Sequence, residues 1–322
     1  MLAGWLKAPK ILQFPSLAIL DWCPDQLNTE TLRLEFRFIL VNQSCQPARC
    51  SFIGPGFAIH KTWIDGKHLC QAMSEPIILY DIPSTVPGQA WSPNPCKTRY
   101  CLNYKGLPYK TVWVEYPDIE ALSKKIGTLP TDVKNGKPFY SLPAIYDPNT
   151  KTALAESALI AEYLDATYPD TPKLFPVGTH ALQHAFVAAF MQTLSPVWQF
   201  ALPAANNILN PPSEVYFRRT REAMFGKKLE DVVPTGLAAN EEWAKVKAAF
   251  DTVDGWLQKG QADGPYLTGK EPAFADFVVA SSILCFKKIW GAESSQWKDV
   301  MSWNTGRWEA LIKEFEKYET IV

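Results

Sequence analysis

WSPNPCKTRYCLNYKGLPY, residues 91–109, is the stretch from which the fold of this chain can be worked out. The apolar run IILYDIP, residues 77–83, precedes it and predicts a short buried strand. A strand, a proline-rich turn and a helix that opens near Pro93 would present a hydroxyl and free backbone N–H groups to an anion. The sequence therefore predicts an anion-binding position at Ser92.

Two further stretches follow in a fixed order. SLPAI, residues 141–145, precedes an apolar strand, and AESA, residues 155–158, opens a helix. Each is ordinary by itself, because a Leu-Pro pair can mark only a bend, with about 5% of X–Pro bonds cis in folded proteins. Acids and hydroxyls are likewise common in the first turn of any helix. The order of the three stretches is what favours a functional interpretation.

Composition excludes several classes of protein. The chain has 322 residues, 47% of them hydrophobic, which is enough for two domains with substantial cores. Its net charge is −1, from 32 basic and 33 acidic residues, and no block of like charge indicates a nucleic-acid partner. No run of 18 uncharged apolar residues indicates a membrane span.

The cysteines and histidines predict neither a disulfide framework nor a metal site. Four of the seven cysteines fall in the first 72 residues, and the others are Cys96, Cys101 and Cys285. This uneven distribution is unlike a secreted disulfide scaffold. No histidine combines with a CxxC pair, and His180 and His184, four residues apart, are better explained as helix-surface residues than as metal ligands.

Residues 1–72 behave differently from the rest of the chain. Alternating apolar positions at residues 32–40 allow one strand, but prolines and cysteines interrupt any longer period. The opening residues fit neither a signal peptide nor a transit peptide well. We therefore expect an irregular extension, either disordered or a mistranslated leader upstream of Met73, which would be the natural start.

From residue 73 the chain divides into two domains. Residues 73–177 alternate strands and helices as in a small mixed α/β sheet of thioredoxin type. The expected elements are strands at 77–83, 110–114 and on either side of Pro143, and helices at 95–106, 119–125 and 156–167. The proline-rich segment 168–176 is a linker. Residues 178–322 have helical periodicity, with helices at 178–205, 213–226, 240–259, 273–290 and 304–318.

These stretches resemble a glutathione transferase, and more narrowly the fungal-specific (Fua) class related to bacterial lignin β-etherases. The matching strings are LYDIP, WSPNPCKTRYCLNYKGL, ALAESALIAEYLDATYPDTPKLFP, YFRRTREAMFGKKLEDV (216–232) and FADF (274–277). They span roughly three quarters of the chain. The resemblance implies glutathione as co-substrate, a cytoplasmic homodimer, and hydrophobic aromatic or polyphenolic ligands.

It also implies roles for individual residues. Ser92 would donate a hydrogen bond to the glutathione sulfur, whose free-thiol pKa of about 8.5 a donor and a helix N-terminus can lower. Asn94 would belong to the same site. Alternatively, Ser92 only caps the helix, or Cys96 is the nucleophile, although we expect Cys96 to be buried and inert.

The other two stretches would hold the peptide part of glutathione. A cis Pro143 would turn the N–H and carbonyl of Leu142 toward the cysteinyl residue. Ser157 would hold the α-carboxylate of the γ-glutamyl group and Glu156 its ammonium.

The chain departs from the family pattern at two positions. Ser141 stands where many relatives place a lysine or glutamine for the glycyl carboxylate, and Lys97, Lys110 and Lys137 remain alternative partners. Ala273 replaces the serine or threonine three residues before Asp276, so the usual capping box is incomplete.

The second substrate remains unidentified by sequence. Aromatic residues that could line its pocket are Phe190, Trp198, Phe200 and Tyr216, of which about half are expected to be plain core. The leading hypothesis is an enzyme that conjugates glutathione or cleaves aryl ethers. A non-catalytic carrier (ligandin) of phenolic or wood-derived compounds is the alternative, and thiol–disulfide exchange is disfavoured because Ser92 stands where such enzymes keep cysteine.

Overall fold

The computed structural model describes residues 59–64, 67–72 and 75–322. Strands β1 (Ile59–Ile64) and β2 (Lys67–Ala72) pair antiparallel, with Ile64 opposite Lys67. This hairpin lies in the segment for which the sequence predicts an irregular extension, and Asp65-Gly66 between the strands is a hairpin signal that the prediction overlooked. The strand expected at residues 32–40 lies outside the described residues.

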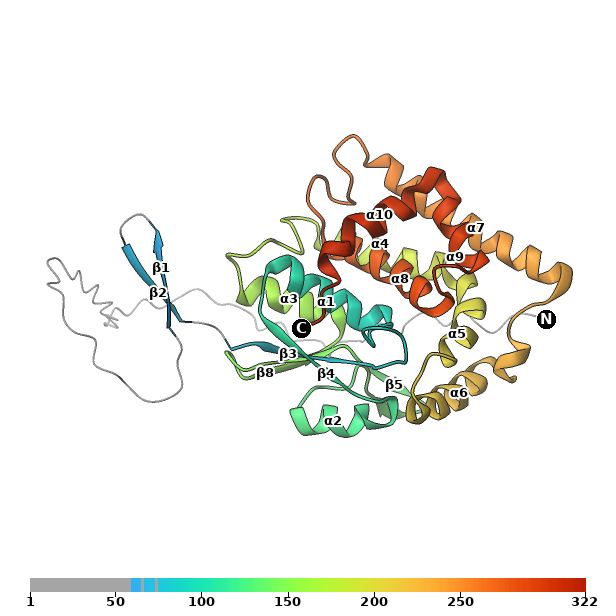
Figure 1. Ribbon diagram of the computed structural model, residues 1–322, viewed down its shortest axis with the longest axis horizontal. Helices are drawn as coiled ribbons and strands as arrows, with labels where there is room; N and C mark the ends of the chain where they lie inside the picture. Colours follow the sequence, from blue (N-terminus) through green and yellow to red (C-terminus); the bar gives the residue numbers. More distant parts are fainter. Residues whose placement is uncertain (1–58, 65–66, 73–74) are drawn as a thin grey trace, which may run out of the picture. The chain divides into compact units, whose positions relative to one another are not determined.

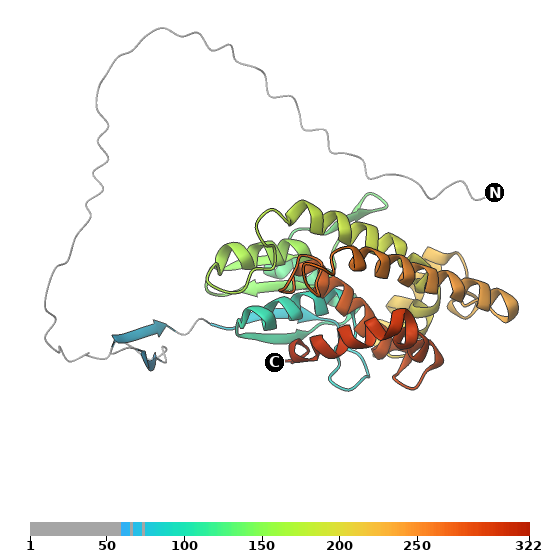
Figure 2. The ribbon, with the colours of Figure 1, turned by 90° about the horizontal axis from the view of Figure 1, so that it is seen from above.

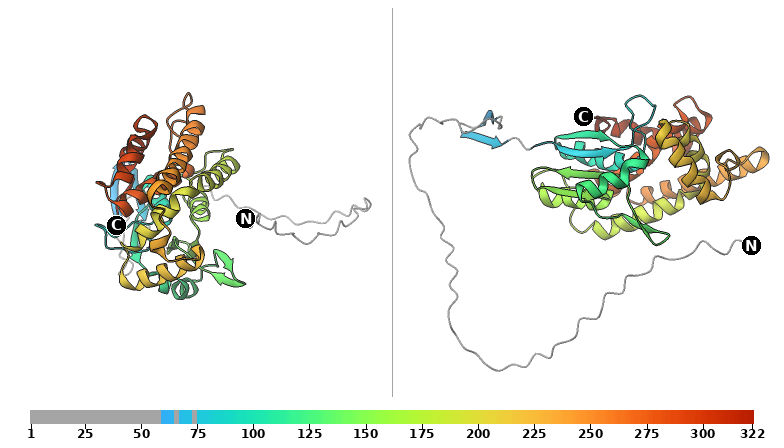
Figure 3. Two further views of the ribbon diagram at one scale, coloured as in Figure 1. Left: turned by 90° about the vertical axis from the view of Figure 1, so that its right-hand side faces the viewer. Right: turned by 90° about the horizontal axis from the view of Figure 1, so that it is seen from below.

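The thioredoxin-type domain is built on a four-stranded mixed sheet with the order β4-β3-β7-β8. Strands β3 (Ile77–Asp81) and β4 (Tyr109–Trp113) are parallel, whereas β7 (Ala144–Asp147) and β8 (Thr152–Ala155) are antiparallel to their neighbours. Helices α1 (Pro93–Lys105) and α3 (Ser157–Thr167) lie on one side of the sheet and α2 (Ile119–Ile126) on the other (Figure 1). The predicted domain type is confirmed. A separate hairpin, β5 (Asp132–Lys134) and β6 (Lys137–Phe139), projects from this domain (Figure 3).

Two ion pairs fix α1 in place. Arg99 donates to Asp81 of β3 at 2.5 Å, and both side chains are buried. Lys105 donates to Asp165 of α3 at 2.7 Å. Removing one partner of a buried pair leaves an uncompensated charge, which typically costs about 3–5 kcal/mol. The helix that begins after Ser92 is therefore held firmly against the sheet and α3.

The helical domain agrees with the prediction except in two places. One continuous helix over 178–205 is wrong: α4 (His180–Thr193) and α5 (Trp198–Asn206) are separated by a 3-10 turn at Ser195–Val197. Pro196 explains the break, because proline disfavours a helical conformation at the residue before it. Helix α9 (Ser295–Ser302) lies where no helix was predicted, although Ser294 caps it by accepting from Trp297 N at 3.2 Å. The remaining helices are α6 (Pro211–Phe225), α7 (Gly236–Lys259), α8 (Phe274–Trp290) and α10 (Arg307–Phe315).

Helix α8 is almost wholly buried, and the backbone N–H groups of its first turn all have acceptors within the protein. Ala273 has no side-chain oxygen, so the serine or threonine half of the capping box is missing. Asp276 supplies the other half by accepting from Ala273 N at 2.9 Å. Gln183 of α4 takes the place of the missing hydroxyl, because its Oε1 accepts from Ala275 N at 2.9 Å. The N–H of Phe274 donates to Leu174 O at 2.9 Å.

The two domains share a continuous apolar core through α1 and α8. The Tyr100 and Phe277 rings lie 6.0 Å apart across this boundary. The C-terminal residues return to the thioredoxin-type domain: Asn103 donates to Tyr318 O at 2.7 Å, and Thr111 N of β4 donates to Val322 O at 2.6 Å. Figures 2 and 3 show the C-terminus beside this strand. The chain end is thus attached to the edge of the sheet next to α1.

Candidate functional site

Ser92 is the N-cap residue of α1, and its side chain is almost fully buried. In the described part of the chain its hydroxyl caps no backbone N–H. The first turn is Pro93, Asn94 and Pro95, and prolines have no N–H. Cys96 N is already bonded to Ser92 O at 3.3 Å. The expectation of several free N–H groups here is therefore wrong, and Asn94 alone supplies one.

The sheet brings together the two other stretches that the sequence singled out, residues 141–145 and 155–158. The Leu142–Pro143 peptide bond is cis, as the sequence predicts. Pro143 O accepts from Glu156 N at 3.2 Å, so the loop before β7 touches the start of α3. Among residues 75–322, nothing hydrogen-bonds to the backbone N–H or carbonyl of Leu142. These two groups are therefore available to an extended peptide.

Glu156 has a conformation that only the surrounding structure can impose. Its φ is 84° and its ψ 125°, a region that costs of the order of 1–3 kcal/mol for a residue other than glycine. Its Oε2 accepts from Ala158 N and Leu159 N, both at 3.1 Å, and its Oε1 accepts from Ser157 Oγ at 3.3 Å. The N–H groups predicted to hold a ligand carboxylate are thus covered by the chain's own carboxylate.

Lys97 connects the starts of α1 and α3. Its ammonium donates to Asn94 Oδ1 at 2.9 Å. Burial lowers the pKa of Lys97, and the nearby Glu156 carboxylate opposes that effect. Of the three lysines that the sequence left as alternatives, Lys97 lies beside Glu156, whereas Lys110 and Lys137 are exposed on β4 and β6. The three lysines are therefore not equivalent.

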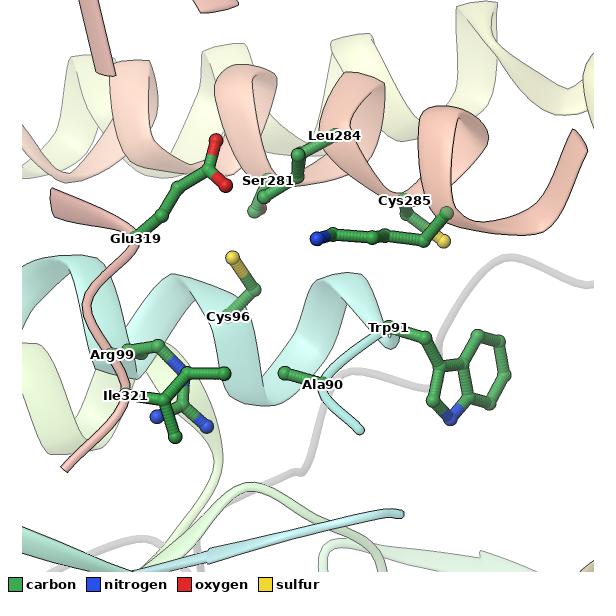
Figure 4. Close-up of a pocket in the computed structure, with 10 residues that line it drawn as sticks. Ala90, Trp91, Cys96, Arg99, Ser281, Leu284, Cys285, Glu319 and Ile321 are labelled. Atoms are coloured by element: carbon green, nitrogen blue, oxygen red, sulfur yellow. The ribbon is translucent and has the colours of Figure 1, made fainter. Parts of the chain in front are cut away.

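Cys96 faces away from this cluster. Its thiol points toward α8 and helps to line a cavity of about 30 Å³ between α1, α8 and the C-terminal segment (Figure 4). That volume has room for ordered water but not for a substrate. Burial raises the pKa of Cys96 to about 12, so the thiol stays protonated at neutral pH. This supports the interpretation of Cys96 as an inert thiol.

Of the four aromatic residues predicted for a second-substrate pocket, three pack within the helical domain. Phe190 lies 6.2 Å from Phe186, Trp198 5.9 Å from Phe286, and Phe200 5.0 Å from Trp243, measured between ring centroids. Tyr216 differs, because it stacks at 5.7 Å on Tyr116, which follows β4 in the other domain. Tyr216 is thus the one of the four that lies at the domain boundary.

The same boundary holds a cationic group that sequence reasoning missed. The guanidinium of Arg221 lies 4.2 Å above the Phe217 ring, and that ring is 6.3 Å from Trp91, the residue before Ser92. Burial lowers the pKa of Lys134 in β5, and Arg221 lowers it further against the effect of Asp132. Within the described residues neither cation has a carboxylate within ion-pair distance. The spacing of Phe217 and Arg221, one helical turn apart in the string YFRRTREAMF, was the available signal.

The described residues contain neither a candidate metal cluster nor a single helix that could span a membrane. No group of three or more histidine, cysteine, aspartate or glutamate residues in them could hold a metal ion. No single helix among them is long and apolar enough to cross a membrane. The segments His180–Thr193 and Ser195–Asn206, with a bend of 41° between them, would together have the length and composition to do so.

Comparison with known proteins agrees with the fold. The model of the glutathione S-transferase N-terminal domain matches residues 91–167, and that of the C-terminal domain matches residues 181–318. The glutathione S-transferase-like protein ustS of Aspergillus flavus is 33% identical over 253 residues, which is 73% of this chain and 88% of the relative. The domain pair is therefore that of a glutathione S-transferase.

Solved structures are more similar still. A glutathione S-transferase of Ceriporiopsis subvermispora, crystallised in complex with glutathione, is 44% identical with a TM-score of 0.74, covering 77% of this chain and 99% of that one. Glutathione transferase GSTFuA3 from Phanerochaete chrysosporium is 43% identical with a TM-score of 0.73, covering 77% and 99%. The chain belongs to the glutathione S-transferase family.

Proposed function

We propose that this protein is a serine-type glutathione transferase in which Ser92 activates the glutathione thiol. The observation that carries the proposal is the hydroxyl of Ser92, which caps nothing at the start of a firmly held helix. With Asn94 N–H it forms a pair of donors for a sulfur anion. Hydrogen bonds to the thiolate stabilise it over the thiol and lower the pKa of the bound co-substrate.

The peptide part of glutathione would lie between the cis-proline loop and α3. The unbonded N–H and carbonyl of Leu142 suit the cysteinyl residue as an added strand. Ser157 and the first N–H groups of α3 would receive the γ-glutamyl carboxylate once the Glu156 carboxylate turns outward to meet the ammonium. Lys97, buried beside Glu156, would add a cation on this side. The glutathione complex of the C. subvermispora relative supports this co-substrate.

The glycyl carboxylate would then be held by Lys134 and Arg221. Lys134 lies on β5 and Arg221 on α6, neither has a carboxylate within ion-pair distance among the described residues, and the charge of Arg221 lowers the pKa of Lys134. Two like charges that share no anion favour a bound carboxylate between them. In this proposal Lys134 and Arg221 do the work of the lysine or glutamine that many relatives have at the position of Ser141.

The reaction would be nucleophilic substitution. The thiolate forms a bond to an electrophilic carbon while the bond from that carbon to the leaving group breaks, and the leaving group departs with the electron pair. The thiol proton passes to solvent or to the leaving group. With an aryl ether the leaving group is a phenolate, which is the reaction expected of a Fua-class, β-etherase-like enzyme. A cytoplasmic homodimer acting on hydrophobic aromatic or polyphenolic compounds completes the proposal.

Measurement of turnover distinguishes this enzyme from a non-catalytic carrier that would bind phenolic compounds at the same site. Conjugation of a panel of aryl halides and cleavage of a model β-aryl ether should be measured beside the affinity for unreactive phenols. The proposal requires Ser92-dependent turnover on at least one electrophile. Phenol binding with no turnover above the solution reaction would favour the carrier.

A further inference from the structure

A second pocket lies wholly within the helical domain. Its volume is about 290 Å³, close to the lower limit for small-molecule sites. It is formed by residues of α5, α6, α8, α9 and the segment 229–233. We propose that it binds a flat, uncharged or cationic aromatic molecule, independently of glutathione.

The lining of this pocket combines aromatic and aliphatic side chains. Phe200 and Trp290 line it, and both rings pack edge-on against Trp243, at 5.0 and 5.7 Å. Leu229 and Val233 line it as well, and Val233 is 36% exposed. Such a lining suits a flat ring, because aromatic groups bury much area at little cost in conformational entropy. The amide side chains of Asn207 and Gln296 also line the pocket and can bond to a polar substituent.

The charges at this pocket disfavour an anion. Arg218 lines it, but three carboxylates already approach its guanidinium: Glu214 at 3.0 Å, Glu222 at 3.5 Å and Glu230 at 2.6 Å. Hydrogen bonds from Asn206 and Arg218 lower the pKa of Glu214, and a hydrogen bond from Arg218 lowers that of Glu230, so both stay ionised at neutral pH. Glu230 itself lines the pocket, and Lys228 is the nearby cation that partly balances it. An anionic ligand would meet an excess of negative charge.

The proposed ligand is therefore unlike glutathione or its conjugates, which are anionic. No residue assigned above to glutathione lines this pocket. Its occupation should neither require glutathione nor compete with it, and this independence separates the inference from the proposed enzymatic function.

Calorimetric titration with a matched pair of probes tests the proposal. The full chain is first saturated with S-hexylglutathione, which would fill the proposed glutathione site and extend its hexyl chain from the sulfur. We expect 2-naphthol to bind with unchanged affinity in its presence, and 2-naphthalenesulfonate, with the same ring but a negative charge, to bind at least tenfold more weakly. Displacement of 2-naphthol by S-hexylglutathione, or equal binding of the two probes, would overturn the proposal.

Variants at two positions of the lining, on different elements, locate the bound ring. Ala204→Phe on α5 and Val233→Phe each fill the pocket and should weaken 2-naphthol binding at least tenfold, whereas Val215→Phe, at an exposed position of α6 outside it, should not. Glu230→Gln should narrow the difference between the two probes. Melting temperature and glutathione conjugation show whether each variant is folded. If both of these lining variants are folded and bind 2-naphthol as the parent does, the ring lies elsewhere and the assignment is wrong.

Discussion

The N-termini of α1 and α8 differ in whether the hydrogen-bonding groups of the first turn have partners within the protein. At α8 the first N–H groups are satisfied by Leu174, Gln183 and Ala273, so the helix start is closed. At α1 two prolines remove N–H groups, and the Ser92 hydroxyl is left uncommitted. Buried polar groups are normally hydrogen-bonded, so a closed helix end indicates a structural role and an open one indicates a ligand.

The start of α3 is intermediate between these two. Its N–H groups are satisfied, but by a side chain of the strained residue Glu156. A single rotation of that side chain would open the helix end without disturbing the fold. The comparison of the three helix starts therefore ranks them by availability to a ligand: α1, then α3, then α8.

Ser92→Ala should have the largest effect. With the hydroxyl gone, only Asn94 N–H remains to stabilise the thiolate, and loss of one such donor typically costs about 10²- to 10³-fold in rate. The pH–rate profile should also move to higher pH, because the bound thiol loses a group that favours its ionised form. Stopped-flow absorbance of the thiolate and steady-state conjugation rates measure both.

Cys96→Ser is the matched control for this change. It lies one turn further along α1, and its protonated thiol should be dispensable for conjugation. A pH profile that stays in place in Ser92→Ala would mean that Asn94 N–H is the main stabiliser. Loss of activity in Cys96→Ser, with a mixed disulfide to glutathione in the parent, would instead make Cys96 the working group.

Two substitutions of Glu156 distinguish its role as the cap of α3 from its role in binding glutathione. Glu156→Ala removes both the cap and the charge, so it should lower stability by about 1 kcal/mol and weaken glutathione binding by roughly tenfold or more. Glu156→Gln keeps an acceptor for the helix and removes only the charge. It should preserve the melting temperature but still weaken binding, as fluorescence titration would measure. Unchanged glutathione affinity in both variants would remove Glu156 from the site.

Gln183→Leu should affect stability alone. The change leaves Ala275 N without its acceptor in a buried place, and such a loss costs about 1–3 kcal/mol. Chemical denaturation should show this decrease, and glutathione affinity should not change. Adding Ala273→Ser to the variant sharpens the test, because a hydroxyl at the N-cap should restore part of the loss. A loss of glutathione affinity in the folded variant would show that α8 and the site are coupled.

The carboxyl group of Asp276, at the start of α8, should make the folding stability depend on pH. Burial raises its pKa to about 6, against the opposing effect of hydrogen bonds from Leu267 N and Ala273 N. Because the folded pKa is above the unfolded value of about 3.9, the protonated form favours folding, and stability from this group is lost as pH rises from about 4 to 6. Asp276→Asn should flatten that part of the stability–pH curve by roughly 1.4 kcal/mol per pKa unit. An unaltered curve would place the Asp276 pKa near its ordinary value.

The sequence predicts those features of the fold and the site that depend on short stretches of chain, and it misses those that depend on contacts between distant residues. No one of Ser92, Pro143 and Glu156 is distinctive by itself, but their order along the chain predicted the domain type, and the family resemblance that rests on this order implied the cis peptide. The loss of N–H groups at Pro93 and Pro95 was also visible in the letters SPNP. By contrast, the hydrogen bond from Ala275 N to Gln183 at the start of α8, and the effect of Arg221 on the pKa of Lys134, each join residues about 90 apart, and only the packed chain brings them near each other.

The smallest effect is expected from removal of residues 1–72. Among the residues that the structure describes, the proposed site, the apolar core and the hydrogen-bond partners of the three helix starts all lie within residues 75–322. The chain 73–322 should therefore keep the melting temperature and the glutathione-linked activity of the full chain, and with them the difference between the open end of α1 and the closed end of α8. A large loss of stability with activity per folded molecule unchanged would make the extension part of the fold, whereas a loss of activity alone would make it part of the site.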